Sequence, residues 1–95
     1  MEISKSDIII SIAGRDRGMY FYVIDMEGDY LFLANGKERK LENPKRKKLK
    51  HVRRVSRPES RVAEKIRSDD KLLNSELRRD LAKFSQEHSC QNQGG

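Results

Sequence analysis

The 95-residue sequence has few of the features on which secreted, membrane-spanning or metal-binding proteins depend. Cys90 is the only cysteine, so the chain has no disulfide framework and no cysteine cluster that could join His51 or His88 around a metal. The apolar run near the N-terminus is too short and wrongly flanked for a signal peptide, and no window reaches the roughly 20 apolar residues of a membrane-spanning helix. We therefore expect a cytoplasmic protein in a reducing compartment, with no metal, cofactor or membrane partner.

The sequence also has little that could carry catalysis. It contains no tryptophan and only three tyrosines and three phenylalanines, and a chain of this length buries too small a core for a large enclosed active site. Serine, histidine and aspartate are present, but no spacing places a nucleophile beside a base or pairs two carboxylates between apolar strands. We therefore predict that the protein is not an enzyme and has no small-molecule substrate.

Positive charge is concentrated in one part of the chain. Residues 37–57, here called the basic segment, carry eleven Lys or Arg against two acidic residues and account for the whole net charge of +6. Residues 1–36 are acidic overall, and residues 58–95 are neutral. A dense positive segment in such a chain indicates a polyanionic partner, of which nucleic acid is the commonest.

The N-terminal half of the sequence predicts short β-strands. Runs of β-branched and aromatic residues are separated by turns that contain glycine, and Asn35-Gly36 is a strong turn signal before a fourth strand. Asn43-Pro44 then breaks strand pairing, and the basic stretch 45–48 follows before the last predicted strand. The predicted strands are residues 7–13, 20–26, 30–34, 37–41 and 49–55. Five short strands in about fifty residues indicate a small barrel, so the expected fold class is mainly β.

Two helices are expected after the strands. Ser56, Pro58 and Glu59 fit a capping box at the start of the first helix, and Asn74 or Ser75 can cap the second. The apolar stripes of these helices consist of Val62, Ile66, Leu73, Leu77, Leu81 and Phe84. Such narrow stripes favour a helical hairpin that packs on the strands or on a partner protein.

The chain is expected to have three parts. Residues 1–56 form the barrel, and residues 57–84 form the helical appendage. Residues 85–95 lack periodicity, and we predict that they form a flexible tail.

Residues 14–18 form a loop between the first two predicted strands. Gly14 and Gly18 let the backbone approach a phosphate or a base, and Arg15 and Arg17 offer planar donors for bidentate contacts. An ordinary hairpin turn with solvated arginines would have the same sequence. The nearby basic segment favours the binding role.

Residues 5–18, KSDIIISIAGRDRG, resemble a KOW motif, in which an apolar strand is followed by a glycine, a basic-acidic-basic loop and a second glycine. Residues 20–25 follow where the motif has its second strand. Residues 41–52, LENPKRKKLKHV, and 74–81, NSELRRDL, resemble the bacterial KOW-domain RNA-binding proteins related to the fourteen-e class of archaeal and eukaryotic large-subunit ribosomal proteins. The likeness spans most of residues 3–84. It implies an SH3-like barrel that binds RNA, with contacts from Gly14, Arg15, Arg17 and Gly18.

Ten cations of the basic segment are candidates for contact with a phosphate backbone. Lysines and arginines along a strand edge neutralise phosphates and release counterions, so the affinity should fall steeply with salt. An edge strand protected from aggregation by lysines is the alternative, although edge protection needs far fewer charges. The ten candidates are Lys37, Arg39, Lys40, Lys45, Arg46, Lys47, Lys48, Lys50, Arg53 and Arg54.

Aromatic residues of the predicted strands could stack on unpaired bases, although a small barrel needs about half of them for its core. Tyr20 lies next to the 14–18 loop and is the best candidate among Tyr20, Phe21, Tyr22, Tyr30 and Phe32. The leading hypothesis is a ribosome-associated protein that binds structured RNA, with ribosomal RNA as the first candidate. The other hypothesis is an adaptor that binds ribosomal proteins or the transcription machinery through the barrel or the helices.

Overall fold

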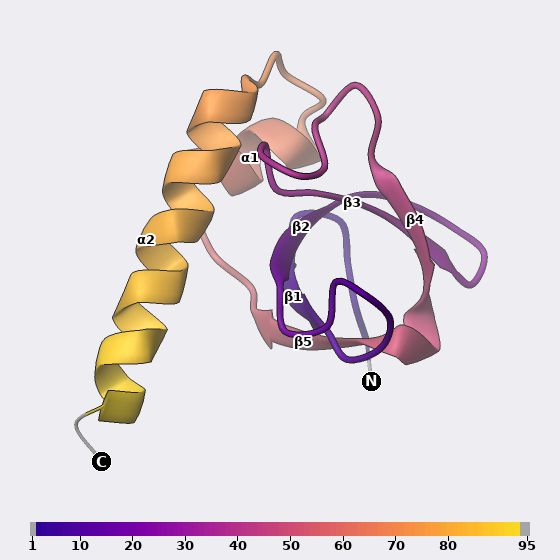
Figure 1. Ribbon diagram of the computed structural model, residues 1–95. Coiled ribbons are helices and arrows are strands. Elements are labelled where there is room, and N and C mark those ends of the chain that lie inside the picture. Colours follow the sequence, from indigo (N-terminus) through magenta and orange to yellow (C-terminus); the bar gives the residue numbers. More distant parts are fainter. Residues whose placement is uncertain (1, 94–95) are drawn as a thin grey trace.

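The computed structural model describes residues 2–93, with side chains described for residues 2–87. The protein is a five-stranded antiparallel sheet followed by two helices (Figure 1). The elements in chain order are β1 (Ile8–Ser11), β2 (Tyr20–Glu27), β3 (Tyr30–Ala34), β4 (Lys45–Lys48), the 3-10 helix η1 (Leu49–His51), β5 (Val52–Ser56), α1 (Arg61–Arg67) and α2 (Asn74–Gln93).

The sheet has the strand order β4-β3-β2-β1-β5 and curls strongly (Figure 1). The long strand β2 pairs with β1 through residues 20–22 and with β3 through residues 22–27, and a register shift between Val23 and Asp25 interrupts its pairing with β3. A sheet of five strands is present, as predicted, but among residues 2–93 no backbone ladder joins β4 to β5, so the sheet is not closed as a barrel. In the chain, η1 connects these two edge strands directly.

The three apolar runs of the N-terminal third form β1, β2 and β3, as predicted. Side chains alternate between the two faces of the sheet, and both faces are covered, which explains why these runs are almost continuously apolar. The cluster inside the curl contains Ile3, Ile9, Phe21, Val23, Leu31, Leu33 and Val52. The cluster beneath the helices contains Ile8, Tyr22, Ala34, Val62, Ala63, Ile66, Leu77 and Leu81.

The strand predicted over residues 37–41 is wrong. Asn35 Oδ1 accepts hydrogen bonds from the backbone N–H groups of Lys37 (3.0 Å) and Arg39 (2.9 Å), so the chain turns back on itself. Gly36, at a φ of +78°, packs directly against the first turn of α2. Residues 35–44 therefore form a loop that is held on the helix.

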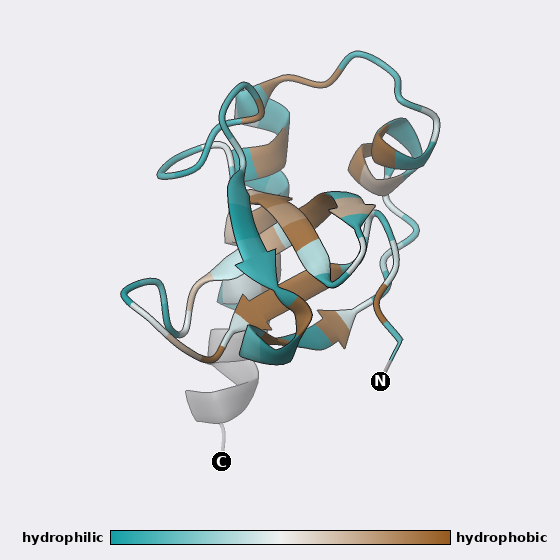
Figure 2. Ribbon diagram, turned by 90° about the vertical axis from the view of Figure 1, so that its right-hand side faces the viewer, coloured by the Kyte–Doolittle hydropathy of each residue, from teal (hydrophilic) through white to brown (hydrophobic). Residues whose placement is uncertain are grey.

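The fourth strand of the sheet is instead β4, where the sequence predicted a connection. Its residues are all basic, and Figure 2 draws it as a hydrophilic strand in front of apolar ones. The last predicted strand, residues 49–55, begins with η1 and continues as β5.

The first helix begins later than predicted. Ser60, not Ser56, is the N-cap of α1, and its Oγ accepts a hydrogen bond from the backbone N–H of Ala63 (3.1 Å). Ser56 is the last residue of β5 and pairs with Ile8. Sheet pairing therefore prevails over the local capping signal.

The second helix begins at Asn74, but the Asn74 side chain does not cap it. Its Oδ1 accepts from the backbone N–H of Leu41 (2.8 Å), and its Nδ2 donates to Glu42 (2.6 Å). Glu76 acts at this helix end instead, because its carboxylate accepts from the backbone N–H of Leu73 (3.0 Å). Asn74 thus ties the 35–44 loop to α2.

Both helices pack on the sheet of the same chain, which was one of the two predicted alternatives (Figure 1). The hydroxyl of Tyr22 donates to Asp80 of α2 and lies 3.2 Å from Ser60 Oγ, so one buried ring links β2 to both helices. Leu73 does not extend the apolar face as predicted, because its side chain is 53% exposed.

The helix α2 continues to Gln93. Residues 85–93 of the predicted flexible tail therefore lie in this helix, and residues 94–95 lie outside the described residues. The chain has no glycine or proline between Asn74 and Gly94 that would end the helix earlier. Across residues 2–93, no helix has the length and apolar character needed to span a membrane.

Candidate nucleic-acid interface

The 14–18 loop connects β1 to β2 and lies across one end of the curled sheet (Figure 1). Gly14 and Gly18 have φ values of +85° and +89°, which favour glycine. Backbone hydrogen bonds from Gly18 N to Ser11 O (2.8 Å) and from Arg17 N to Gly14 O (3.3 Å) hold the turn. Both arginines of the loop are exposed, as a binding role requires.

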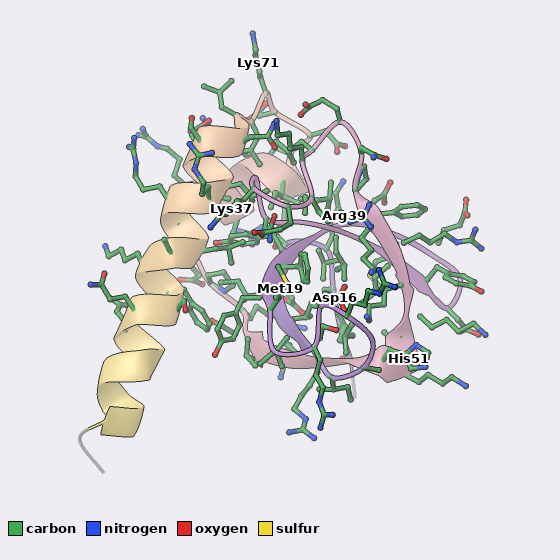
Figure 3. All side chains as sticks on the ribbon, in the orientation of Figure 1. Asp16, Met19, Lys37, Arg39, His51 and Lys71 are labelled. Carbon is green, nitrogen blue, oxygen red and sulfur yellow. The ribbon has the colours of Figure 1, made fainter. Side chains whose placement is uncertain are left out.

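Asp16, between the two arginines, is buried and holds the loop in place (Figure 3). Its Oδ1 accepts hydrogen bonds from Lys47 Nζ (2.6 Å) and Ser11 Oγ (2.7 Å), and Lys45 Nζ lies 3.0 Å from its Oδ2. Lys47 Nζ also donates to the carbonyl oxygen of Ala13 (2.7 Å). These contacts fix the loop to the inward face of β4.

The Asp16 carboxylate stays ionised far into the acidic range. Burial alone would raise the pKa of Asp16, but the hydrogen bonds from Lys47 and Ser11 and the ammonium of Lys45 hold it well below its ordinary value of 3.8. At neutral pH the single negative charge of Asp16 is therefore shared by Lys45 and Lys47, so two of the ten candidate cations of the basic segment are held within the protein.

The outward face of β4 has a different character. Arg46 and Lys48 are exposed and lie near the Tyr30 ring, with the Arg46 guanidinium carbon 3.9 Å and Lys48 Nζ 5.9 Å from the ring centroid. Because side chains alternate along a strand, neighbouring basic residues of β4 have opposite surroundings. The inward pair fixes the loop, and the outward pair faces solvent.

The structure places nine of the fifteen predicted site residues in three separate hollows. Lys48, Lys50 and Arg53 line a groove of about 750 Å³ over η1. Arg15, Arg39 and Lys45 line a smaller hollow beside the 14–18 loop. Gly18, Tyr20 and Lys37 line a third, whose other wall is α2. The predicted residues that line none of the three are Gly14, Arg17, Lys40, Arg46, Lys47 and Arg54.

Most of the ten candidate cations have no acidic partner in the described part of the chain. Carboxylates lie within 4.0 Å of Lys45, Lys47 and Lys37 only, and the Lys37 pair with Glu38 is long and exposed. Arg53, Arg54 and Lys50 are exposed, as are Lys40, Arg46 and Lys48, and Arg39 is half-buried. Seven of the ten therefore keep their charge available to a ligand.

Tyr20, the aromatic residue predicted to stack on a base, packs against α2. Its half-buried ring makes an edge-to-face contact with Phe84 of α2, with 5.2 Å between the centroids. Tyr30 is the aromatic residue that lies among exposed cations. Sequence reasoning included Tyr30 without preferring it, because its neighbours on β4 are distant in the chain.

Asp16 was also missed as a site residue. The signal was present, since a carboxylate in a loop that binds a polyanion is unfavourable unless it has cationic partners within the protein.

Comparison with models of protein families finds no match to this chain, and comparison with curated proteins finds none either. What the interface can bind therefore follows from its own chemistry.

Proposed function

We propose that this protein binds structured RNA through the exposed cations of β4, η1, β5 and the 14–18 loop. The observation that best supports this proposal is a set of five exposed cations without ion-pair partners among the described residues: Arg46, Lys48, Lys50, Arg53 and Arg54. These five belong to one continuous stretch of nine residues. Such a surface neutralises phosphates and releases counterions, which drives binding without reading the sequence of the RNA.

We also propose that the curled sheet is a partly open SH3-like barrel. The antiparallel order β4-β3-β2-β1-β5, the shared and bent strand β2, and the 3-10 turn between β4 and β5 support this assignment. The likeness of residues 5–18 to a KOW motif agrees with it. Ribosomal RNA is the structured RNA that this combination favours, and a cytoplasmic, ribosome-associated role in translation follows.

The adaptor hypothesis has less support. The apolar stripes that would bind a partner protein, represented by Val62, Ile66 and Leu77, are buried against the sheet of the same chain. No second apolar stripe of that kind is exposed on α1 or on the part of α2 with described side chains. An acidic partner protein remains the outcome to test against RNA.

The test removes charge without disturbing the fold. A variant with Arg46, Lys48 and Lys50 all changed to glutamine should bind ribosomal RNA fragments more weakly. The negative slope of log affinity against log salt should become shallower by about 2 to 3, because each lost phosphate contact removes about 0.7 to 0.9. Lys45 and Lys47 are left unchanged, since they hold Asp16. Fluorescence anisotropy across a salt series measures the slope.

The matched control removes the same charge from the helical side, by changing Arg61, Lys71 and Lys83 to glutamine. All three are exposed, and Figure 3 shows Lys71 pointing away from the sheet. This control should keep the wild-type slope. If both triple variants lower the slope equally, net charge rather than this surface determines binding, and the proposal is wrong.

A further inference from the structure

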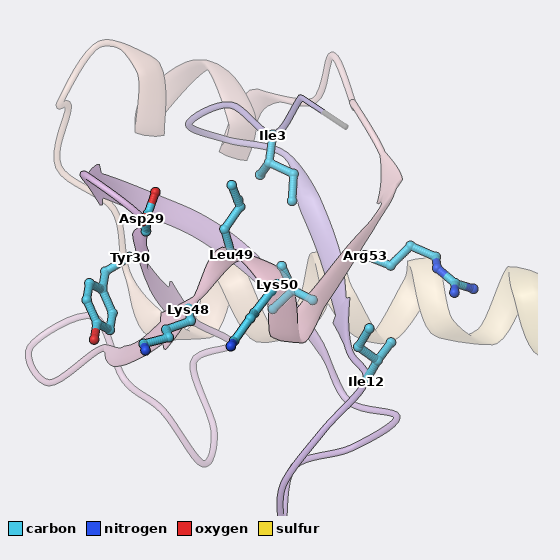
Figure 4. Close-up of a pocket in the computed structure, with 9 residues that line it drawn as sticks. Ile3, Ile12, Asp29, Tyr30, Lys48, Leu49, Lys50 and Arg53 are labelled. Atoms are coloured by element: carbon cyan, nitrogen blue, oxygen red, sulfur yellow. The ribbon is translucent and has the colours of Figure 1, made fainter.

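The groove over η1 combines an apolar floor with a cationic rim (Figure 4). It has a volume of about 750 Å³, within the range of small-ligand sites. It runs from the β2–β3 turn to the end of β1 that leads into the 14–18 loop. Its lining residues are Ile3, Ile12, Asp29, Tyr30, Lys48, Leu49, Lys50, Val52 and Arg53.

The floor of the groove consists of packed apolar side chains. Ile3 and Val52 are 7% and 3% exposed and belong to the apolar cluster inside the curl, while Leu49 packs against the same cluster. The backbone N–H of Leu49 donates to the carbonyl oxygen of Asp29 (2.8 Å), which fixes η1 against the β2–β3 turn. Ile12 extends this floor and is 39% exposed. An apolar surface of this kind favours the face of a flat, apolar ligand group.

The rim of the groove favours an anion. Lys48, Lys50 and Arg53 are exposed and have no ion pair among the described residues, and Asp29 is the one acidic residue in the lining. Tyr30 forms one wall, and the Arg46 guanidinium lies 3.9 Å from its ring centroid. Stacked arginine and aromatic planes are surfaces on which nucleobases stack.

We propose that this groove holds one unpaired nucleotide of the bound RNA. The base lies on the aliphatic floor beside Tyr30, and its phosphates lie at Lys48 and Lys50. The inference rests on the proposed RNA-binding function and adds a site for a bulged or looped nucleotide. An acidic peptide could also bind the cations of the rim, but Tyr30, with the Arg46 guanidinium against its ring, favours a base.

The geometry also gives the RNA a continuous path. The backbone N–H of Ile12 donates to the carbonyl oxygen of His51 (3.0 Å), so the groove adjoins the chain that enters the 14–18 loop. The chain beyond Ile12 leads to Arg15 and Arg17, which are both exposed. The groove and the loop thus act on one strand.

Two RNA probes test the inference: a labelled hairpin with a single bulged adenosine, and the same hairpin with the bulge deleted. The wild-type protein should bind the bulged hairpin about fivefold or more tightly than its partner, which is the smallest gain expected for one stacked base. Ile12→Ser and Tyr30→Leu should reduce this preference to less than about twofold. The affinity of Ile12→Ser for the hairpin without a bulge should not change.

Met26→Ser is the matched control, because Met26 is 37% exposed and lies outside the groove. It should keep the full preference. Thermal melts verify that each variant folds, and in the wild-type protein the amide signals of Ile12 and Leu49 should shift only with the bulged hairpin. This second measurement does not depend on any variant.

The possible failures are distinguishable. In one outcome the wild-type protein binds both hairpins equally, and the glutamine variant of Arg46, Lys48 and Lys50 binds neither. This result would keep the proposed function and overturn the nucleotide site. Absence of binding to either hairpin and to ribosomal RNA would overturn both. If a glutamate- and leucine-rich peptide binds the wild-type protein and Ile12→Ser abolishes only that binding, the groove is a protein site.

Discussion

Replacing Asp16 with asparagine removes one charge from a network in which three side chains converge on a buried carboxylate. The Asp16 side chain is 10% exposed, and those of Lys47 and Lys45 are 8% and 27% exposed. Asparagine has nearly the same size and can still accept a hydrogen bond through its carbonyl oxygen. The substitution therefore isolates the charge, and it leaves the Lys47 ammonium buried without a counterion.

Removing one partner of a buried ion pair lowers the free energy of unfolding by roughly 3 to 5 kcal/mol. Because asparagine keeps one acceptor for Ser11 or Lys47, and because Lys45 can move toward solvent, we expect Asp16→Asn to lower the free energy of unfolding by about 3 kcal/mol. A domain of this size has about 5 to 14 kcal/mol of stability, so the variant should still fold.

The pH dependence gives a second signature of the same contact. The folded-state pKa of Asp16 lies below its ordinary value of 3.8, so the stability it confers is fully present above that value. The advantage of wild type over Asp16→Asn should shrink as the pH falls below 3.8 toward the lower pKa of the folded state. Protonation then removes the same charge in the wild-type protein.

Urea denaturation followed by circular dichroism at pH 7 measures the effect. Asp70→Asn, at an exposed position between the helices, is the control and should change stability by less than about 0.5 kcal/mol. Adding Lys47→Met to Asp16→Asn should recover part of the loss, because the uncompensated ammonium is gone. A loss below about 1 kcal/mol for Asp16→Asn would refute the account of the loop.

Three further substitutions test the packing of the helices on the sheet, each by urea denaturation. Gly36→Ala should cost about 2 kcal/mol or more, since its Cβ would lie 2.2 Å from a carbonyl oxygen of α2 at a φ of +78°; unchanged stability would mean that the loop does not rest on the helix. Tyr22→Phe should cost about 1.5 to 3 kcal/mol through the lost hydrogen bond to Asp80, and a smaller loss would show that water replaces the hydroxyl. Ser60→Ala should cost about 1 kcal/mol as a lost N-cap, whereas Ser75→Ala, exposed on α2, should stay within about 0.5 kcal/mol.

The apolar part of the fold was predictable because local sequence and tertiary packing agree there. β-branched and aromatic residues fill β1, β2 and β3, and the apolar spacing of α1 and α2 faces the sheet. The errors lie where a distant contact prevails over a local signal. Ser56 carries a capping pattern but pairs with Ile8 in the sheet, and Asn74 has the side chain of an N-cap but binds Leu41.

β4 could not be predicted from its own residues. A strand without an apolar residue has no hydrophobic period, and Lys47 occupies a position that pairs with buried Leu31. Its burial depends on Asp16, which is 31 residues away in the chain. For the candidate site, the sequence predicts a basic surface beside a glycine-bounded loop, and its role in binding stays a prediction. The inward and outward lysines could be separated only once the strand register was known.

This separation changes what the basic segment can do for a ligand. The four cations of β4 contribute two charges to the outside, from Arg46 and Lys48, and use two to hold Asp16. Loss of the outward pair should therefore weaken the attraction to RNA and lower its salt dependence while the loop stays in place. Loss of Asp16 should not lower that salt dependence, because it frees Lys45 and Lys47 instead of removing them, but it should weaken binding through a displaced 14–18 loop. The two variants therefore separate the effect of electrostatic attraction from the effect of loop geometry. They can do so because the outward side chains of β4 attract RNA and the inward side chains hold the loop.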